Sequence, residues 1–467
     1  MKNYIKISLL AVSLTLASCN GWLDVNDNPN YVADASVETL LPSAQFVTVS
    51  QLGGDLTMVG DFWAQYATHN KTTNQYITVM NYDLTVSSSY FIRPWRAVYA
   101  QVLPTLKTII DKCADGGYSN FEFEAKAMVA YEMYLLTSLY GDVAWTEGPL
   151  SDTYFEQPHF DTPEVAQTKL VEWLEALRAM DSAAVAADEA SHPSTSSDMI
   201  FAGDVDAWLQ FVNTLYLKVL MRDFTANKAK IEALLAEDNF LAVDAAFDHF
   251  LDAADKSNPL YENDRRKLNT PENIRACSDI LGVLSASDPR LSYYFEGAVA
   301  AGTATYGQLV DPAVAPRFAV AATDAVYFGT ADEALFLKAE AYARLADSDN
   351  AKACYEAAVT AAFARTGNAN AAADFLAGDY AFAGGSAEAM VEQIINHKWA
   401  SMPRCMPLEA WFDISRTGYP ARGTTITLYT GVIDSPAVRF LIPDSSSIYN
   451  ENAPEVKPLT EKLWWHK

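Results

Sequence analysis

The sequence has few cysteines, few histidines and no apolar run of the roughly 20 residues that a membrane span needs. None of its 5 cysteines forms a Cys-x-x-Cys pair, and its 6 histidines include no His-Glu-x-x-His motif, so we expect no metal site. It also lacks a Gly-x-Ser-x-Gly motif and a glycine-rich phosphate loop. We therefore predict that the protein is not an enzyme and uses no cofactor.

Basic residues are also scarce, with 33 Lys and Arg against 59 Asp and Glu and a formal net charge of −26. A surface this acidic repels nucleic acid, so we expect no nucleic-acid partner. Hydrophobic residues make up 50% and aromatic residues 12% of the chain, which excludes disorder. At 467 residues, the chain is long enough for several domains or for a repeat architecture.

The amino terminus has a basic head, Lys2 and Lys6, followed by a short apolar run from residue 7 to 16. Leu16-Ala17-Ser18 then leads directly into Cys19, which resembles the cleavage box of bacterial lipoproteins. We expect a signal peptide at 1–18, a lipidated Cys19 with a tether at 19–35, and a lipid-anchored outer-membrane protein that faces the cell exterior. The alternative is that Cys19 is an ordinary buried residue of an early helix.

Beyond the tether, apolar residues recur at helical spacing in most of the chain. The predicted helices cover 36–52, 88–113, 121–140, 163–180, 204–224, 226–237, 331–346, 350–365 and 386–402. The stretches between them are loop-like, namely 67–87, 141–161, 182–203, 250–330 and 415–460. Loops of this length commonly carry function.

One helix pair has the spacing of a tetratricopeptide repeat. Ala339 and Tyr342 are followed by Ala351, Tyr355 and Ala358, although the Trp and the final Pro of the repeat are absent. Residues 121–140 with 163–180, 204–224 with 226–237, and the amino-terminal helices would form further pairs. We predict one mainly all-α domain at 36–467, with about four stacked helix pairs in a superhelical scaffold and a loop-rich insertion at 250–330.

Several stretches along nearly the whole chain resemble the SusD/RagB family of outer-membrane nutrient-binding lipoproteins. They are CNGWLDVNDNPN after the cleavage box, LLPSAQ at 40–45, EAKAMVAYEMYLLTSLYGDVAWTEGPL at 124–150, WLQFVNTLYLKVLMR at 208–222, EALFLKAEAYARL at 333–345, IINHKWASMPRCMPLEAWFDISRTGYP at 394–420 and IPDSSSIYNENAPEV at 442–456. The resemblance implies a TonB-dependent outer-membrane transporter (SusC-like) as partner. It also implies a ligand site built from an amino-terminal loop region and the central insertion. Ile414-Ser415-Arg416 departs from the Arg pair that members often carry.

Aromatic rings among Asn, Asp and Gln side chains are typical of sugar-binding surfaces. Such residues are dense at 62–95 and in the 250–330 insertion. The candidate ligand-binding residues are Tyr66, Tyr76, Asn81, Tyr82, Tyr90, Trp95, Tyr293 and Tyr306. We expect the loop tyrosines Tyr76, Tyr82 and Tyr306 to be exposed, whereas Trp95 flanks a helix and suits the core.

Three other features have structural interpretations. The turn at Gly141–Pro149 would end a helix and prevent it from restarting. Arg416 is available for a buried carboxylate, and the Trp464–Trp465 pair would pin the carboxyl terminus by packing.

We predict a surface lipoprotein that captures a glycan and delivers it to the transporter. The alternatives are a member of the same family that captures a peptide, and a repeat scaffold that binds a protein partner. A surface hydrolase is a third possibility, although no catalytic motif supports it.

Overall fold

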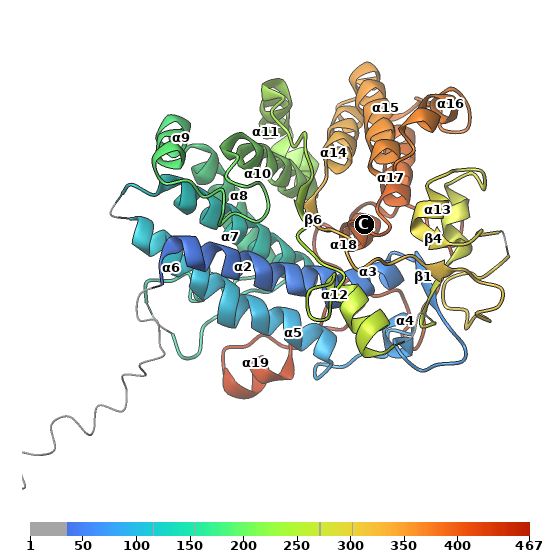
Figure 1. The fold of residues 1–467 in the computed structure, drawn as a ribbon, viewed down its shortest axis with the longest axis horizontal. Helices are drawn as coiled ribbons and strands as arrows, with labels where there is room; N and C mark the ends of the chain where they lie inside the picture. The colour runs from blue at the N-terminus through green and yellow to red at the C-terminus, as the bar shows by residue number, and fades with distance from the viewer. Residues whose placement is uncertain (1–34, 115, 154, 270–271, 301) are drawn as a thin grey trace, which may run out of the picture.

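The computed structural model describes residues 35–114, 116–153, 155–269, 272–300 and 302–467. The predicted signal peptide, Cys19 and the tether up to residue 34 lie outside these residues. Within them the chain is mainly helical, as predicted (Figure 1). No helix in this part of the chain is both long enough and apolar enough to cross a membrane.

The elements alternate between long helices and short connecting pieces. The α-helices are α2 (Val37–Gln51), α3 (Thr57–Trp63), α4 (Ile77–Met80), α5 (Ser89–Ala97), α6 (Leu103–Cys113), α7 (Ser119–Tyr140), α8 (Pro163–Arg178), α9 (Ser182–Ser191), α10 (Val205–Leu220), α11 (Phe224–Glu237), α12 (Pro259–Tyr261), α13 (Leu291–Tyr294), α14 (Ala331–Arg344), α15 (Ser348–Arg365), α16 (Ala372–Ala377), α17 (Ala387–Ser401), α18 (Pro407–Thr417) and α19 (Asp444–Tyr449). The π and 3₁₀ segments are η1 (Leu52–Leu56), η2 (Val98–Val102), η3 (Met221–Asp223), η4 (Glu262–Lys267), η5 (Ser278–Gly282) and η6 (Ala369–Ala371). The strands are β1 (Ala67–His69), β2 (Ala245–Phe247), β3 (Ile274–Ala276), β4 (Phe295–Glu296), β5 (Arg317–Phe318) and β6 (Val326–Gly329).

Every helix predicted from the apolar spacing is present. The predicted helix at 88–113 is α5, η2 and α6 in direct succession. Helix α9 was not predicted and lies within the expected 182–203 loop. Asp181 caps its start by accepting hydrogen bonds from the Ala183 and Ala184 backbone amides. Because Val185 is its one buried side chain, α9 has no apolar period to reveal it.

The predicted repeat pair forms α14 and α15, which pack along each other. Ala339, Ala351, Tyr355 and Ala358 are fully buried between them, so the small residues allow close approach and the ring fills the groove. The other long helices continue this packing, α7 against α6, α8 and α10, and α14 against α17. In Figure 1 these helices form an arc, with the insertion at one end of it.

A small antiparallel sheet joins the amino-terminal loop to the central insertion. Its strand order is β1-β3-β5-β4, and β1 pairs with β3 so that Ala67 faces Ala276 and His69 faces Ile274. This pairing places the two regions that were expected to carry the ligand site next to each other.

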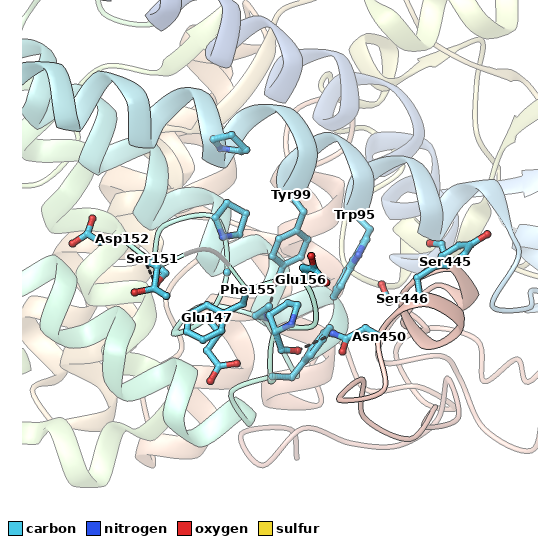
Figure 2. Close-up of a pocket in the computed structure, with 18 residues that line it drawn as sticks. Trp95, Tyr99, Glu147, Ser151, Asp152, Phe155, Glu156, Ser445, Ser446 and Asn450 are labelled. Atoms are coloured by element: carbon cyan, nitrogen blue, oxygen red, sulfur yellow. Dashed lines mark hydrogen bonds between the residues drawn. The ribbon is translucent and has the colours of Figure 1, made fainter.

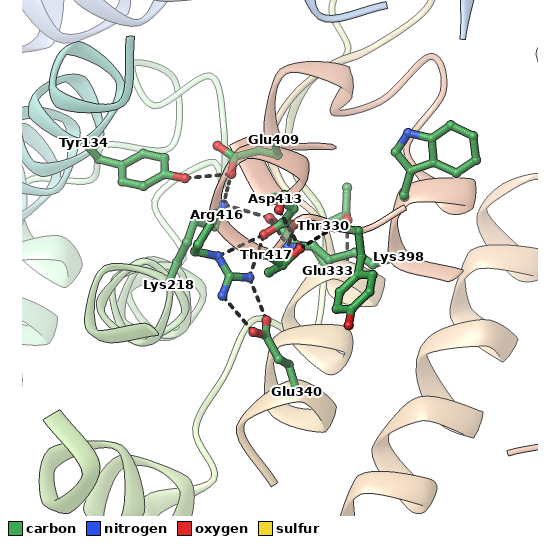
Figure 3. A network of polar contacts seen from close by, with 12 residues as sticks. Tyr134, Lys218, Thr330, Glu333, Glu340, Lys398, Glu409, Asp413, Arg416 and Thr417 are labelled. Atoms are coloured by element: carbon green, nitrogen blue, oxygen red, sulfur yellow. Dashed lines mark hydrogen bonds and ion pairs between the residues drawn. The ribbon is translucent and has the colours of Figure 1, made fainter. Parts of the chain in front are cut away.

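A buried network of ion pairs ties α10, α14, α17 and α18 together (Figure 3). Lys218 contacts Glu333 at 2.8 Å and Glu409 at 3.1 Å, and Lys398 contacts Glu333 at 3.3 Å. Glu409 also accepts a hydrogen bond from the Tyr134 hydroxyl at 2.8 Å, which adds α7 to the network. Removing one member of such a network would leave a buried charge without compensation and would strongly destabilise the fold.

Arg416 belongs to this network and binds a buried carboxylate, as predicted. Its guanidinium donates two hydrogen bonds of 2.7 Å to Glu340 and a third of 2.7 Å to Asp413. Burial alone would raise the pKa of Glu340, but Arg416 and Arg344 outweigh it and lower the pKa to about 2. The predicted packing of the carboxyl-terminal Trp pair is present for Trp465, whose buried ring centre lies 4.3 Å from the Arg222 guanidinium, but not for Trp464, which is 39% exposed.

Candidate functional site

An open pocket of about 670 Å³ lies between α5, η2 and α6 on one side and α19 on the other, with the 144–160 loop as a third wall (Figure 2). It is lined by Trp95, Tyr99, Pro104, Ala144, Glu147, Gly148, Pro149, Ser151, Asp152, Thr153, Phe155, Glu156, Pro158, Phe160, Ser445, Ser446, Tyr449 and Asn450. Its volume falls within the roughly 300–1,000 Å³ of typical small-molecule sites. Five aromatic side chains lie among its lining residues, together with eight polar or charged ones.

The first wall of this aromatic pocket is a pair of rings on one helical face. Trp95 and Tyr99 are four residues apart, so they lie one above the other, with ring centres 4.6 Å apart. Figure 2 shows both rings extending from the same helical stretch. Phe160 stacks on Trp95 with ring centres 5.9 Å apart and an interplanar angle of 8°. Tyr140 packs behind Trp95 at 4.8 Å and thereby limits movement of the indole.

The second wall is the loop that follows α7. Its base is closed where Val143 and Asp161 exchange backbone hydrogen bonds of 3.1 and 2.8 Å. The Asp161 carboxylate also accepts hydrogen bonds from the Trp145 and Thr146 backbone amides. Gly141 ends α7 with a φ of 80°, as its sequence context predicted. The turn at Gly141–Pro149 does more than end a helix, because its residues Glu147, Gly148 and Pro149 also line the aromatic pocket.

The third wall is α19, which rests on the loop through two amide side chains. Asn450 donates a hydrogen bond to the Pro158 carbonyl at 2.7 Å, and Asn452 donates one to the Gln157 carbonyl at 2.7 Å. No side chain of α19 itself is buried. Two of the lining rings are exposed, Tyr449 at 78% and Phe155 at 37%. Exposed rings of this kind can pack against the flat apolar face of a ligand.

Of the predicted ligand-binding residues, Trp95 lines the aromatic pocket. It is only 7% exposed, so it also belongs to the core, as its position beside a helix suggested. The other predicted residues lie elsewhere.

The expectation that Tyr82 and Tyr306 are exposed is wrong, since each ring is 1% exposed. They form a closed ring cluster with Tyr429, whose ring centre lies 6.2 Å from that of Tyr82 and 5.4 Å from that of Tyr306. The Tyr306 hydroxyl donates to the Met80 carbonyl at 3.3 Å. Polar sequence around these tyrosines did not prevent burial, because a distant segment covers them.

That covering segment is the 424–433 loop. The Tyr429 hydroxyl donates a 2.5 Å hydrogen bond to the Asn81 side-chain oxygen, and the Val432 amide donates to the Asn81 carbonyl at 2.9 Å. A Cβ added at Gly307 would lie 2.3 Å from the Tyr429 ring, so only glycine permits this approach. The predicted residue Asn81 therefore holds the cover of the closed ring cluster in place.

Three further predicted tyrosines also have structural roles. Tyr66 is fully buried and donates from its hydroxyl to the Trp399 carbonyl at 2.5 Å. Tyr76, expected to be exposed, is only 8% exposed and packs near Phe62 with ring centres 6.2 Å apart. Tyr90 is half-buried, and burial raises its pKa to about 12.

Tyr293 lines a different pocket, of about 690 Å³, together with Tyr327 and Asp324. The Arg404 guanidinium lies 4.1 Å from the centre of its ring, and Arg404 also pairs with Asp324 at 2.6 Å. This pocket shares no lining residue with the aromatic pocket.

The sequence reasoning missed Tyr99, Phe155, Phe160, Tyr449 and Asn450. A usable signal existed for Tyr99, which follows Trp95 by one helical turn on the same face. For the others no local signal existed, because they meet only when α19 and the 144–160 loop come together in the fold.

The structure thus combines a tetratricopeptide-like helical scaffold with an open pocket that five aromatic rings line. A family model described as "Starch-binding associating with outer membrane" (SusD-like) matches residues 29–435. The chain belongs to this SusD-like family, whose description names starch binding and association with the outer membrane.

Solved structures share the fold across nearly the whole chain. A SusD homologue from Bacteroides uniformis is 21% identical, covers 93% of this chain and 100% of its own, and has a TM-score of 0.73. A chitin-binding SusD homologue from Flavobacterium johnsoniae is 21% identical, with coverage of 91% and 97% and a TM-score of 0.73. A SusD/RagB family protein from Bacteroides thetaiotaomicron is 20% identical, with coverage of 92% and 99% and a TM-score of 0.73. Among curated proteins, no match to the chain is found.

Proposed function

We propose that the protein captures a glycan in the aromatic pocket and delivers it to a TonB-dependent outer-membrane transporter. The observation that supports this proposal is an open pocket, lined by the rings of Trp95, Tyr99, Phe155 and Tyr449, on a chain of the SusD-like family. One structural relative is described as chitin-binding, which agrees with a glycan ligand. The residues of the pocket suit holding a sugar face rather than changing it.

The rings and the polar groups have separate tasks in this proposal. Tyr449 and Phe155 at the mouth would stack on sugar faces, and Trp95 and Tyr99 would form the inner wall. Because Asn450 already donates to the Pro158 carbonyl, it would hold α19 at the distance that the ligand needs. Sugar hydroxyls would bond to Ser445, Ser446 and the pocket carboxylates.

Lipidation of Cys19 would anchor the protein on the outer membrane beside its transporter, facing the exterior. Membrane fractionation tests this directly. Cys19→Ala is expected to move the protein from the outer-membrane fraction to the soluble fraction, and co-purification of the lipidated protein should recover a TonB-dependent transporter. Recovery of wild-type protein in the soluble fraction would contradict the anchor.

Glycan capture is tested by affinity electrophoresis through gels that contain single polysaccharides. Tyr449→Ala is expected to lower affinity at least tenfold, since it removes a ring that is exposed at the mouth. Trp464→Ala is the matched control, because Trp464 is 39% exposed and does not line the pocket. Equal retardation of both variants and wild type on every polysaccharide would reject the pocket. Binding of peptides alone would favour a peptide ligand instead.

A further inference from the structure

The charged side chains that line the aromatic pocket are all acidic. They are Glu147, Asp152 and Glu156, and no Lys or Arg is among the described residues that line it. This one-sided charge distribution suggests that the pocket discriminates between ligands by their charge.

Two of these carboxylates have cationic or ionisable partners outside the lining. Asp152 pairs with Lys107 at 2.8 Å, and hydrogen bonding from Lys107 lowers the pKa of Asp152. The His159 backbone amide and ring donate to Glu147, which lowers the pKa of Glu147. Lys107 is itself shared with Asp111 at 2.6 Å, so one cation serves two acids. Both pocket acids therefore remain ionised at neutral pH, and the rim stays negative.

Glu156 is exposed on the loop, and it lines the same pocket as Tyr99 and Trp95 (Figure 2). A ligand that enters this pocket therefore meets an acidic group on its wall.

Local charge matters more here than the net charge of the whole chain. The formal charge is −26, but salt screens exposed charges beyond about 8 Å at physiological ionic strength. Within about 4 Å, a like charge weakens an interaction roughly fivefold even in bulk water, and more where water is excluded. Three carboxylates on one pocket can thus separate acidic from uncharged ligands.

We propose that the pocket selects uncharged or amine-bearing glycans and rejects glycans that carry uronate or sulfate groups. This selection rests on the proposed function, since it concerns the same pocket. The structure assigns Glu156 the main part in it, as a specificity-determining residue.

The experiment is an array of polysaccharides and oligosaccharides probed with the mature chain. Its uncharged members are starch, laminarin, galactomannan and chitin oligosaccharides, its amine-bearing members are chitosan oligosaccharides, and its acidic members are polygalacturonate, alginate and heparin. Ligands of the pocket are defined as those whose signal falls at least tenfold in Tyr449→Ala. We expect every such ligand of the wild type to be uncharged or amine-bearing.

Charge reversal then tests the residue. Glu156→Lys is expected to raise binding of at least one acidic member about fivefold or more, and to leave binding of uncharged members within about twofold. Glu172→Lys is the matched control, because Glu172 is exposed in the middle of α8, lies outside the pocket lining and gives the same change in net charge. It should leave the whole profile unchanged.

The outcomes separate this inference from the proposed function. An acidic glycan that the wild type binds as strongly as an uncharged one, with a signal lost in Tyr449→Ala, would overturn charge selection and leave glycan capture standing. Charge selection would also be overturned if Glu156→Lys and Glu172→Lys changed the binding of acidic glycans equally, or if neither changed it. If no glycan signal depended on Tyr449, glycan capture at this pocket would fail as well.

Discussion

The aromatic pocket and the closed ring cluster are built from the same residue types, and they differ in what covers them. Tyr82 and Tyr306 are buried beneath the 424–433 loop, whereas Tyr449 at the end of α19 and Phe155 on the 144–160 loop are exposed in an open pocket. A polar sequence context alone therefore does not show that a tyrosine is exposed and available to a ligand. A ring serves binding only where the remote segment that packs near it leaves it partly uncovered.

The largest expected difference between the two sets of rings is in stability. Tyr82→Ala removes a ring that is 1% exposed and contacts Trp63, Tyr306 and Tyr429, so we expect a loss of about 3–5 kcal/mol in the free energy of unfolding. Denaturant titration measures this loss. Tyr449→Ala removes an exposed ring and should lose less than about 0.5 kcal/mol. Equal losses in the two variants would contradict the difference in burial between the closed ring cluster and the aromatic pocket.

The next effect is the pH dependence of the free energy of unfolding, which we attribute to a buried carboxyl group on α7. Burial raises the pKa of Glu132 on α7 to about 7 from a usual 4.5, against a hydrogen bond from the Thr48 hydroxyl. The folded state holds the Glu132 proton more tightly than the unfolded state does. The contribution of Glu132 to the free energy of unfolding is therefore full below pH 4.5, and about 3 kcal/mol of it is lost as the pH rises to about 7. Glu132→Gln should therefore gain stability relative to wild type as pH rises.

Unfolding free energies of Glu132→Gln and wild type at pH 5 and pH 8 measure this gain. Glu172→Gln, exposed on α8, is the control and should show no such trend. The affinity of the aromatic pocket for an uncharged glycan should stay constant from pH 6 to pH 8, since Glu147 and Asp152 have lowered pKa values. A difference between Glu132→Gln and wild type that did not vary with pH would contradict a buried, protonated Glu132.

A smaller effect comes from forcing the closed ring cluster open. Gly307→Ala places a methyl 2.3 Å from the Tyr429 ring at a φ of 84°, so we expect a loss of about 1–3 kcal/mol in unfolding free energy. Gly302→Ala is the control, because Gly302 has a φ of 81° and nothing within 4 Å of the added methyl. Thermal unfolding of both variants separates the steric clash with Tyr429 from the cost of placing alanine at a positive φ. Equal melting temperatures of the two variants would contradict the close packing of Tyr429 on Gly307.

The smallest effect concerns the support of α19. Asn450→Ala removes the 2.7 Å hydrogen bond to the Pro158 carbonyl, which we expect to cost about 1 kcal/mol and to weaken glycan affinity a few-fold. Asn368→Ala, which removes amide hydrogen bonds to Thr366 far from the pocket residues, should leave affinity unchanged. Affinity electrophoresis compares the two, and equal affinities would mean that α19 needs no such support.

Much of the helical scaffold was predictable because its signals are local. Ala339, Ala351 and Tyr355 lie within one helix pair, so their spacing alone indicates which faces meet. The SusD-like family assignment was likewise predictable, since its motifs recur in order along the chain. Arg416 was correctly assigned to a buried carboxylate, although its partner Glu340 was not identified.

The candidate site was not predictable in the same way, because its walls are distant in the sequence. Trp95 was found by composition, but Tyr449 joins it only through the packing of α19 against the 144–160 loop. Conversely, the burial of Tyr82 depends on Tyr429, which lies far along the chain. Exposure of a loop ring is a property of tertiary contacts, which composition and spacing do not encode.

Hydrogen exchange with a bound glycan tests the central claim most directly. The array hit that binds most tightly should slow amide exchange in peptides that cover 144–153, 155–160 and 444–450, the walls around Tyr449. Peptides that cover 76–83, 303–310 and 424–433 should exchange as they do without ligand. Protection of the second set and not of the first would place the glycan at the closed ring cluster and contradict the account.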